Sequence, residues 1–247
     1  IELKDDDTVL YAQGQDTDTI FQYSLDQYPT ASPVTITGLT NGTSYTFNVW
    51  AINAFGYSAP SDASAAVSPV APIGVFGLGL DNGGSVTNVL NKITIGSTGN
   101  ASDFGDLSVS RGALGSMSSA TRAIFFGGQL SSGRSNVIDY KEFSSSGNLS
   151  DFGDMSETSQ DNAGSGSDTR GVYSVQTTNA SEYITYASTG NGTQFGDYAN
   201  ISYSYRQQVV SSNTRVVFCG NGDASFDEVM EYFTIASTGN ATDFGDL

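Results

Sequence analysis

The chain has 247 residues and a formal net charge of −17, with nine Lys and Arg residues and no His. Because phosphate contacts need clustered basic side chains, this composition disfavours binding to nucleic acid or to an anionic membrane surface. The lack of His removes the commonest general base and metal ligand and excludes a Cys–His nucleophile. The single cysteine, Cys219, excludes an internal disulfide.

The residue content predicts an all-β protein. Fourteen Phe and thirteen Tyr residues are spread along the chain, which argues for packed cores rather than disorder. Abundant Gly, Ser, Thr and Asn suit many short strands and tight turns. No apolar run approaches the ~20 residues of a membrane helix, so membrane insertion is not expected. Because Ile1 is not a natural start, we expect the parent chain to begin earlier.

Residues 1–68 contain alternating apolar and polar stretches, as in "SYTFNVWAIN", which is the period of a half-buried strand. Within "ITGLTNGTSYTFNVWAINAFGYSAPS", Leu39 is followed six residues later by Tyr45. This stretch resembles the C-terminal half of a fibronectin type III domain. The resemblance implies a β-sandwich, incomplete at its front, in which the Tyr45 hydroxyl bonds the backbone near the turn. No Arg-Gly-Asp loop is present, so integrin binding is not implied.

A Pro-containing linker at 69–72 is followed, in 73–247, by four copies of one twelve-residue phrase, the last of which reads "ASTGNATDFGDL". The aromatic residues of the phrase are separated by 48, 43 and 49 positions. Periods of about 40 to 50 residues with strand-forming composition predict a β-propeller-like array, here of about four blades. Two alternatives stay open, a small ring that four blades close and an array that continues with further blades after Leu247. The phrase itself is predicted to form a corner whose aromatic residue packs inward, at Phe104, Phe152, Phe195 and Phe244.

Two further positions recur with the phrase. Upstream of it, inside a predicted strand, stands an asparagine or an acid: Asn91, Asp139, Glu182 and Glu231. Downstream of each complete phrase, a Thr-Arg pair opens an apolar run, with the arginines at Arg122, Arg170 and Arg215. An arginine that is even partly buried needs a carboxylate partner. We therefore expect each of these arginines to contact a phrase aspartate of its own or an adjacent blade.

The second copy, with Arg111, the pair Gly127-Gly128 and Tyr140, resembles a Kelch repeat. The family's Trp is missing from every copy, and the glycine pair is lost or altered in the last two. Repeats of the form "STGNATDFGDL" are similar to those in structural proteins of marine tailed bacteriophages. That resemblance implies a virion component, such as a tail fibre, appendage or capsid-surface protein.

The composition of the phrase suggests three chemical roles, namely calcium ligation, glycosylation and catalysis. Calcium ligation by its aspartates is disfavoured, because the spacing lacks a glutamate and the third copy carries Gln194. Asn and Asp instead bond their own backbone in turns, and no metal or cofactor is expected. The calcium candidates are Asp103, Asp106, Asp151, Asp154, Asp243 and Asp246.

Seven asparagines stand in N-x-S/T sequons, and four of these share one repeat position, so turn composition explains them more simply than glycosylation. The seven are Asn41, Asn100, Asn148, Asn179, Asn191, Asn200 and Asn240. Carboxylates that recur once per blade belong to a scaffold by default. No catalytic residue and no enzymatic activity are therefore expected.

These patterns predict a non-enzymatic virion protein that displays loops on a rigid scaffold. The loops 80–87, 129–135 and 221–228 differ while their flanks agree, and such loops carry recognition. The expected partners are other virion proteins and a host surface glycan or receptor, and a homo-oligomer is left open. The alternatives are a bacterial secreted or cell-surface adhesin that binds glycans, and an accessory region of an extracellular enzyme.

Overall fold

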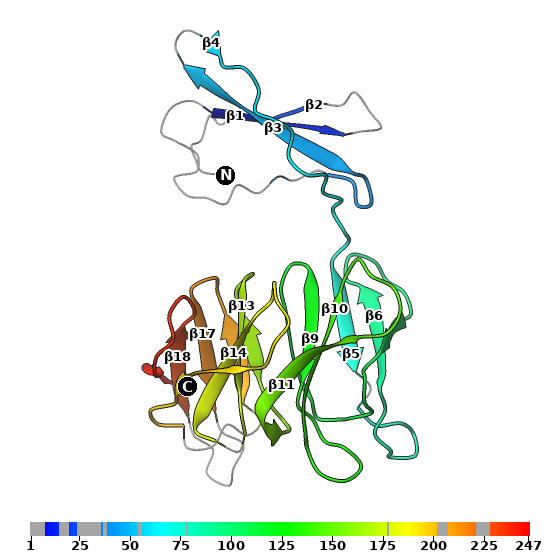
Figure 1. Ribbon diagram of the computed structural model, residues 1–247, viewed down its shortest axis with the longest axis vertical. Helices are drawn as coiled ribbons and strands as arrows, with labels where there is room; N and C mark the ends of the chain where they lie inside the picture. Colours follow the sequence, from blue (N-terminus) through cyan, green and yellow to red (C-terminus); the bar gives the residue numbers. More distant parts are fainter. Residues whose placement is uncertain are drawn as a thin grey trace. The chain divides into compact units, whose positions relative to one another are not determined.

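The computed structural model describes residues 8–14, 20–23, 36, 39–53, 56–77, 79–176, 178–201, 207–220 and 228–247 (Figure 1). Within these ranges the regular elements are β-strands in antiparallel sheets and none is a helix, which confirms the all-β class. Two compact units are present, Ile1–Ile73 with Thr94–Thr98, and Gly74–Ile93 with Gly99–Leu247. No helix in the described ranges has the length and apolarity needed to cross a bilayer.

Unit 1 contains one described sheet of order β2-β1-β3-β4. Its strands are β1 (Thr8–Gly14), β2 (Ile20–Tyr23), β3 (Tyr45–Asn53) and β4 (Gly56–Tyr57). The buried Tyr45 opens β3, and its hydroxyl accepts a hydrogen bond from the Thr40 amide at 3.0 Å, while Leu39 is half-buried. This is the contact expected from the tyrosine-corner pattern. Within the stretch 1–68 that is expected to form the sandwich, residues 1–7, 15–19, 24–35, 37–38 and 54–55 lie outside the described residues.

Four sheets follow one another along the rest of the chain, each joining strands that are consecutive in sequence. The first has three strands, β5 (Ile73–Gly77), β6 (Val89–Thr94) and β7 (Ser102–Asp106). The second has β8 (Gly115–Ser118), β9 (Arg122–Phe126), β10 (Ser135–Glu142) and β11 (Ser150–Ser159). The third has β12 (Gly164–Gly166), β13 (Arg170–Ser174), β14 (Ala180–Thr185) and β15 (Thr193–Asp197). The fourth has β16 (Gln208–Ser211), β17 (Arg215–Cys219), β18 (Val229–Thr234) and β19 (Thr242–Asp246).

A Ser-x-Thr-Arg turn joins the first two strands of the second, third and fourth sheets. In the second sheet the Ser119 hydroxyl accepts the Arg122 amide at 3.1 Å, and the Ser119 amide donates to the Arg122 carbonyl at 3.0 Å. Ser167 with Arg170 and Ser212 with Arg215 repeat both bonds. The serine hydroxyl thus closes a tight hairpin turn, as short polar side chains do.

The second half of the phrase is the last strand of each sheet, so the prediction that the whole phrase forms a corner was wrong for this half. Its register slips at one repeated point, so that two phrase residues oppose one residue of the neighbouring strand. Leu90 pairs with Gly105 and Asn91 pairs with Asp103, which leaves Phe104 as the extra residue of a β-bulge. The other three sheets carry the same bulge, at Phe152, Phe195 and Phe244.

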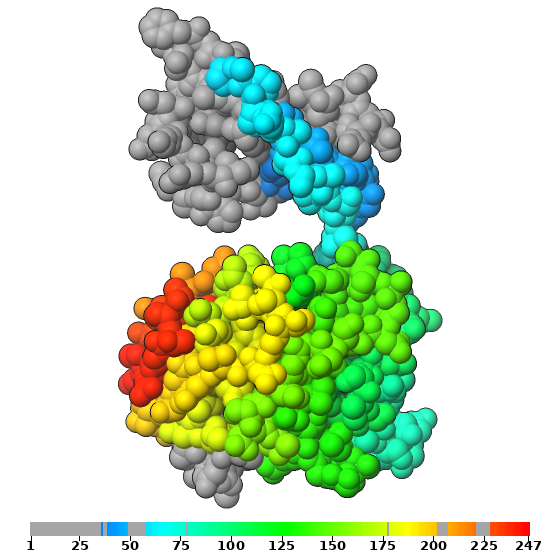
Figure 2. All heavy atoms as spheres, in the orientation of Figure 1, coloured from blue at the N-terminus to red at the C-terminus, as the bar shows by residue number. Residues whose placement is uncertain are grey.

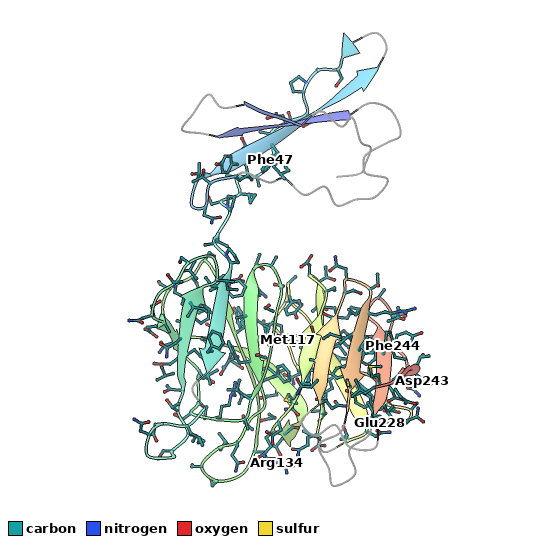
Figure 3. All side chains as sticks on the ribbon, turned by 180° about the vertical axis from the view of Figure 1, so that it is seen from behind. Phe47, Met117, Arg134, Glu228, Asp243 and Phe244 are labelled. Carbon is teal, nitrogen blue, oxygen red and sulfur yellow. The ribbon has the colours of Figure 1, made fainter. Side chains whose placement is uncertain are left out.

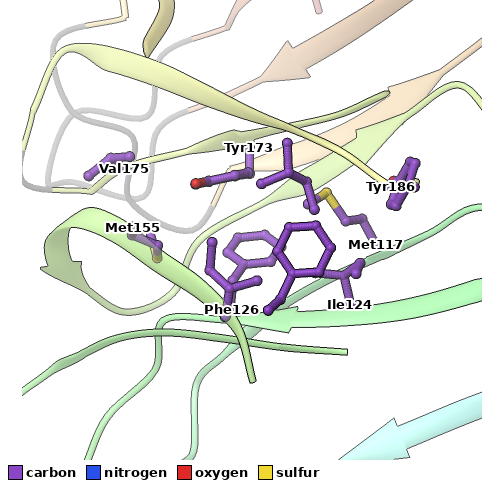
Figure 4. Close-up of a cluster of buried hydrophobic side chains, with 10 residues drawn as sticks. Met117, Ile124, Phe126, Met155, Tyr173, Val175 and Tyr186 are labelled. Carbon is purple, nitrogen blue, oxygen red and sulfur yellow. The ribbon is translucent and has the colours of Figure 1, made fainter. Parts of the chain in front are cut away.

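Consecutive sheets pack face to face around two apolar clusters. The strand β12 contacts both β8 and β16, so the first strands of the last three sheets lie side by side. Between the second and third sheets, Met117, Ile124 and Phe126 pack with Tyr173 and Tyr186 (Figure 4). Between the third and fourth, Phe195, Tyr198, Phe218 and Phe233 form edge-to-face ring pairs with centroids 5.3–6.0 Å apart. Each sheet therefore buries its apolar side chains against its neighbours in the chain.

Candidate functional site

The first aspartate of the phrase bonds its own backbone across the bulge. In the first copy, Asp103 Oδ1 accepts the Gly105 amide at 2.9 Å. Asp151 with Gly153 and Asp243 with Gly245 repeat this bond at 3.1 and 3.0 Å. Because the bond spans the extra aromatic residue, the carboxylate stabilises the bulge, in the way that aspartates stabilise turns.

The phrase aspartates are not assembled as cation ligands. In the parts of the chain that the structure describes, no three Cys, Asp or Glu side chains are grouped so that they could hold a metal ion. Asp103, Asp106, Asp151, Asp154, Asp243 and Asp246 therefore converge on no such centre. Calcium needs six to eight oxygens around one point, and the bulge geometry instead spreads these carboxylates along strands.

The phrase asparagines join consecutive sheets. In the last three copies the asparagine accepts, through Oδ1, the amide of the second aspartate in the preceding phrase: Asp106 to Asn148 at 3.2 Å, Asp154 to Asn191 at 3.0 Å, and Asp197 to Asn240 at 3.2 Å. Backbone bonds run beside them, for example from the Gly239 amide to the Phe195 carbonyl at 2.9 Å. Three of the seven sequon asparagines thus have a defined role as acceptors between sheets.

The glycine that follows the aromatic residue of the phrase is required because the backbone of the next phrase passes close to it. A Cβ placed on Gly105, Gly153 or Gly196 would overlap the carbonyl oxygen of a glycine in the next phrase, Gly147, Gly190 and Gly239 respectively. Gly245 in the last copy has nothing within 4 Å of the corresponding position. The aromatic residues follow the same division. Phe104, Phe152 and Phe195 are 3–4% exposed, whereas Phe244 is 50% exposed because no described sheet covers it.

The three Thr-Arg arginines do not contact phrase aspartates, so that prediction was wrong. Each guanidinium instead lies over a tyrosine of its own sheet: Arg122 over Tyr140 at 5.0 Å, Arg170 over Tyr183 at 4.4 Å and Arg215 over Tyr232 at 4.4 Å. Two of them also reach the next sheet, where Arg122 donates to the Tyr186 carbonyl and Arg170 to the Ile235 carbonyl. The carboxylate that pairs with Arg122 is Glu142, on β10 of the same sheet.

Replacing Arg170 by alanine is expected to lower the free energy of unfolding by about 1–2 kcal/mol. The change removes a charge-assisted hydrogen bond of 2.7 Å to the Ile235 carbonyl and the stacking on Tyr183. Urea unfolding followed by circular dichroism measures the loss. Arg215→Ala is the matched control, because Arg215 makes the same stacking contact on Tyr232 and no described residue accepts a hydrogen bond from it. Equal losses in the two variants would exclude the bond between sheets as the cause.

The acid that stands before each of the last three phrases is buried and accepts backbone amides just after the preceding phrase. Asp139, Glu182 and Glu231 are 0–3% exposed. Each follows immediately after the register slip, so the bulge turns its side chain inward. Asp139 accepts the amide and hydroxyl of Ser108, at 3.1 and 3.0 Å. Glu182 accepts the Ser156 amide at 3.2 Å.

Glu231 makes the fullest set of these bonds. Its two carboxylate oxygens accept the amides of Ala199, Asn200 and Ile201 at 2.8–3.4 Å and the Asn200 side-chain amide at 3.2 Å. Three successive amides pointing at one carboxylate form an anion-binding nest. This carboxylate therefore holds the turn that follows the third phrase and links the third sheet to the fourth.

The other two acids have charged or polar partners in addition. Tyr173 donates to Glu182 Oε2 at 2.7 Å, and burial together with the Glu182 charge raises the pKa of this tyrosine, so it stays a donor. Arg111 Nη2 donates to Asp139 Oδ2 at 2.9 Å, and neither side chain is exposed. Burial lowers the pKa of Arg111 and the Asp139 charge acts in the opposite direction. Arginine remains charged at neutral pH, so this is a buried ion pair.

The repeat pattern shows the position of this acid but does not indicate its role. The available signal was an acid at one repeat position inside an otherwise apolar strand, since a buried carboxylate needs several donors. Lys141 was also missed. It is 5% exposed, lies over the Phe104 ring at 4.4 Å and donates to the carbonyls of Phe104 and Gly147, which links the first sheet to the second.

The exposed connections that lead into the last-but-one strand of each sheet differ among the sheets. In 80–87 the Asp81 carboxylate accepts the amides of Gly83 and Ser85 at 2.8 and 2.9 Å. In 129–135 the backbones of Gln129 and Gly112 exchange two hydrogen bonds, of 2.6 and 2.9 Å. Arg134 and Glu228, which belong to two such connections, lie at the same end of unit 2 (Figure 3). The remainder of the third loop, 221–227, lies outside the described residues.

No family model matches the chain, and no curated protein matches its sequence.

Proposed function

We propose that this chain is a non-enzymatic structural and adhesive protein of a tailed-phage virion, which displays recognition loops on a rigid β scaffold. One observation carries the proposal. The buried contacts recur from sheet to sheet, whereas the exposed connections 80–87 and 129–135 differ from each other in sequence and in hydrogen bonding. In proteins with a constant scaffold and variable loops, the residues that bind a partner usually lie on the loops.

Two findings support the finer architecture that we propose, a fibronectin type III module followed by a Kelch-like propeller array. The Thr40–Tyr45 bond is the tie expected of a tyrosine corner. The second, third and fourth sheets are four-stranded antiparallel meanders in chain order, and their first strands are neighbours, as in propeller blades. The twelve-residue phrase, which resembles repeats of marine tailed phages, supplies hydrogen bonds between consecutive sheets.

The described loops are held by their own backbone and leave polar groups exposed. Residues 131–134, "SSGR", are exposed, and a bond of 2.9 Å from the Leu130 amide to the Gly133 carbonyl closes the loop. Hydroxyl and guanidinium groups on a preformed loop suit hydrogen bonding to sugar hydroxyls, and preorganisation lowers the entropic cost of binding. The net charge of −17 disfavours a polyanionic target. We therefore expect a neutral or zwitterionic surface glycan as the ligand.

The recognition role is tested with labelled protein on bacterial cells and on a glycan array. The triple variant Ser131→Ala, Ser132→Ala and Arg134→Ala is expected to weaken binding by about tenfold or more, since each lost hydrogen bond is worth about 0.5–1.5 kcal/mol. Its thermal melting should match the wild type, because all three side chains are exposed. Asn213→Ala, at an exposed hairpin turn between first and second strands, is the control and should bind normally.

Immunogold labelling of purified particles tests the virion assignment separately. If the particles are labelled but the protein binds no cell and no glycan, the protein has a purely structural role in the virion. Binding that survives the triple variant unchanged would exclude the 129–135 loop as the recognition surface.

A further inference from the structure

Each contact between consecutive sheets buries the same positions. We call the face of a sheet that meets the next sheet its trailing face, and the face that meets the preceding sheet its leading face. On the trailing face of the second sheet, Met117, Phe152 and Met155 are 7%, 3% and 2% exposed. On that of the third, the positions that match Phe152 and Met155 are Phe195 and Tyr198, each 3% exposed. This face is therefore a dry apolar surface wherever a sheet follows.

The trailing face of the fourth sheet has the same apolar character but is uncovered. By strand register, Val210 matches Met117, while Phe244 and Leu247 match Phe152 and Met155 in the phrase. Val210, Phe244 and Leu247 are 68%, 50% and 75% exposed. The last strand forms one edge of unit 2 (Figure 2), and Phe244 lies on that edge (Figure 3). The Arg215 guanidinium, unlike that of Arg170, has no carbonyl acceptor among the described residues.

The leading face of the first sheet is uncovered too. Phe76 matches Phe125, Tyr173 and Phe218 of the later sheets, which are 0–3% exposed, but Phe76 itself is 55% exposed. The turn Gly99–Ala101 is also exposed. Its counterparts use two amides and an asparagine Oδ1 to bond the preceding phrase, as Gly239, Asn240 and Ala241 do. The first sheet therefore presents the complementary half of the contact that the fourth sheet lacks.

We propose that the fourth sheet of one copy of this chain docks on the first sheet of a second copy, through the contacts that join sheets within the chain. Gly99 and Ala101 would donate to the carbonyls of Phe244 and Asp246, and Asn100 would accept the Asp246 amide. Both faces are exposed in the single copy that the structure describes. A contact between two different faces is heterologous, so it produces a closed ring or an extended filament.

Charge and apolar burial act in opposite directions on this association. Each copy carries a formal charge of −17, so copies repel one another at low ionic strength. The docking faces are apolar, and added salt screens the repulsion without weakening apolar burial. Raising NaCl from about 0.05 M to about 0.5 M shortens the Debye length from about 14 Å to about 4 Å. Association is therefore expected to strengthen over this range of salt.

Sedimentation velocity over a concentration series tests the proposal. The wild-type chain is expected to form dimers and larger species as its concentration rises. Phe244→Asp and Phe76→Asp should each weaken association by about tenfold or more, because each puts a charge into an apolar contact. An equimolar mixture of the two variants should form dimers that do not grow, since Phe244→Asp keeps an intact first sheet and Phe76→Asp an intact fourth sheet.

Val109→Asp is the matched control, because Val109 is 42% exposed and lies on neither docking face. It should associate as the wild type does, and circular dichroism should show that all three variants are folded. A wild type that stays monomeric at every concentration and salt level would overturn the proposal. So would a Phe76→Asp variant that dimerises as well as the wild type, because association would then join two fourth sheets.

Discussion

Replacing Asp139 by alanine is expected to lower the free energy of unfolding of unit 2 by about 3–5 kcal/mol, because it leaves the Arg111 guanidinium buried without its counter-ion. Arg111 is 0% exposed and donates to Asp139 Oδ2 at 2.9 Å and to the Phe125 carbonyl at 3.3 Å. Once the carboxylate is removed, only neutral acceptors remain for that charge. Ser108 also loses the acceptor of its amide and hydroxyl.

The cost comes from the unpaired charge, so removing both charges should recover most of it. The double variant Arg111→Met, Asp139→Leu is expected to lie within about 1–2 kcal/mol of the wild type, since apolar residues of similar size can replace a buried ion pair. Urea unfolding is monitored by circular dichroism, which reports on both units, and by tryptophan fluorescence, which reports on unit 1 alone. Trp50, the only tryptophan, belongs to unit 1, so its transition should not change. A double variant as unstable as Asp139→Ala would show that shape, not charge, is critical here.

Replacing Gly196 by alanine is expected to destabilise the contact between the third and fourth sheets by about 3 kcal/mol. The new Cβ would overlap the carbonyl oxygen of Gly239, which is backbone and cannot move aside as a side chain would. Separating the two strands would also lengthen the bonds from Gly239 to the Phe195 carbonyl and from Ala241 to the Asp197 carbonyl, both 2.9 Å. The same urea unfolding experiment measures this loss.

Gly239→Ala is the matched control from the same contact. A Cβ there has nothing within 4 Å, so its effect should stay within about 1 kcal/mol, the intrinsic difference between the two residues. If the two variants were equally unstable, the loss of glycine in itself would explain the effect and the steric account would fail.

The sequence predicted the features that depend on local periodicity. The strands that follow each Thr-Arg pair and those that enter each phrase are present, and Phe104, Phe152 and Phe195 are buried. Phe244 is not, because its burial depends on a further sheet rather than on its own strand. The aspartates bond the backbone beside them, as turn chemistry suggested, because that bond needs only residues two positions apart.

The contacts between sheets were not readable in the same way. Arg170 binds the Ile235 carbonyl, and every residue has a carbonyl, so no residue type marks the acceptor. Glu231 likewise binds backbone amides 30 to 32 positions away. The scarcity of basic residues suggested that each Thr-Arg arginine pairs with a phrase aspartate. The ion pairs among the described residues are instead Arg111 with Asp139 and Arg122 with Glu142. The partners depend on how the sheets are stacked, which local sequence does not encode.

Because the bonds between sheets described above join neighbours in the chain, the stability of unit 2 should be close to a sum of nearest-neighbour terms, as in one-dimensional arrays. A middle sheet has two stabilising interfaces, whereas the first and fourth have one each. Opening should therefore start at the ends and move inward. Amides of β13 and β9 would then be the last to exchange with deuterium, and those of β19 among the first, so that a single domain behaves as a graded series of local stabilities.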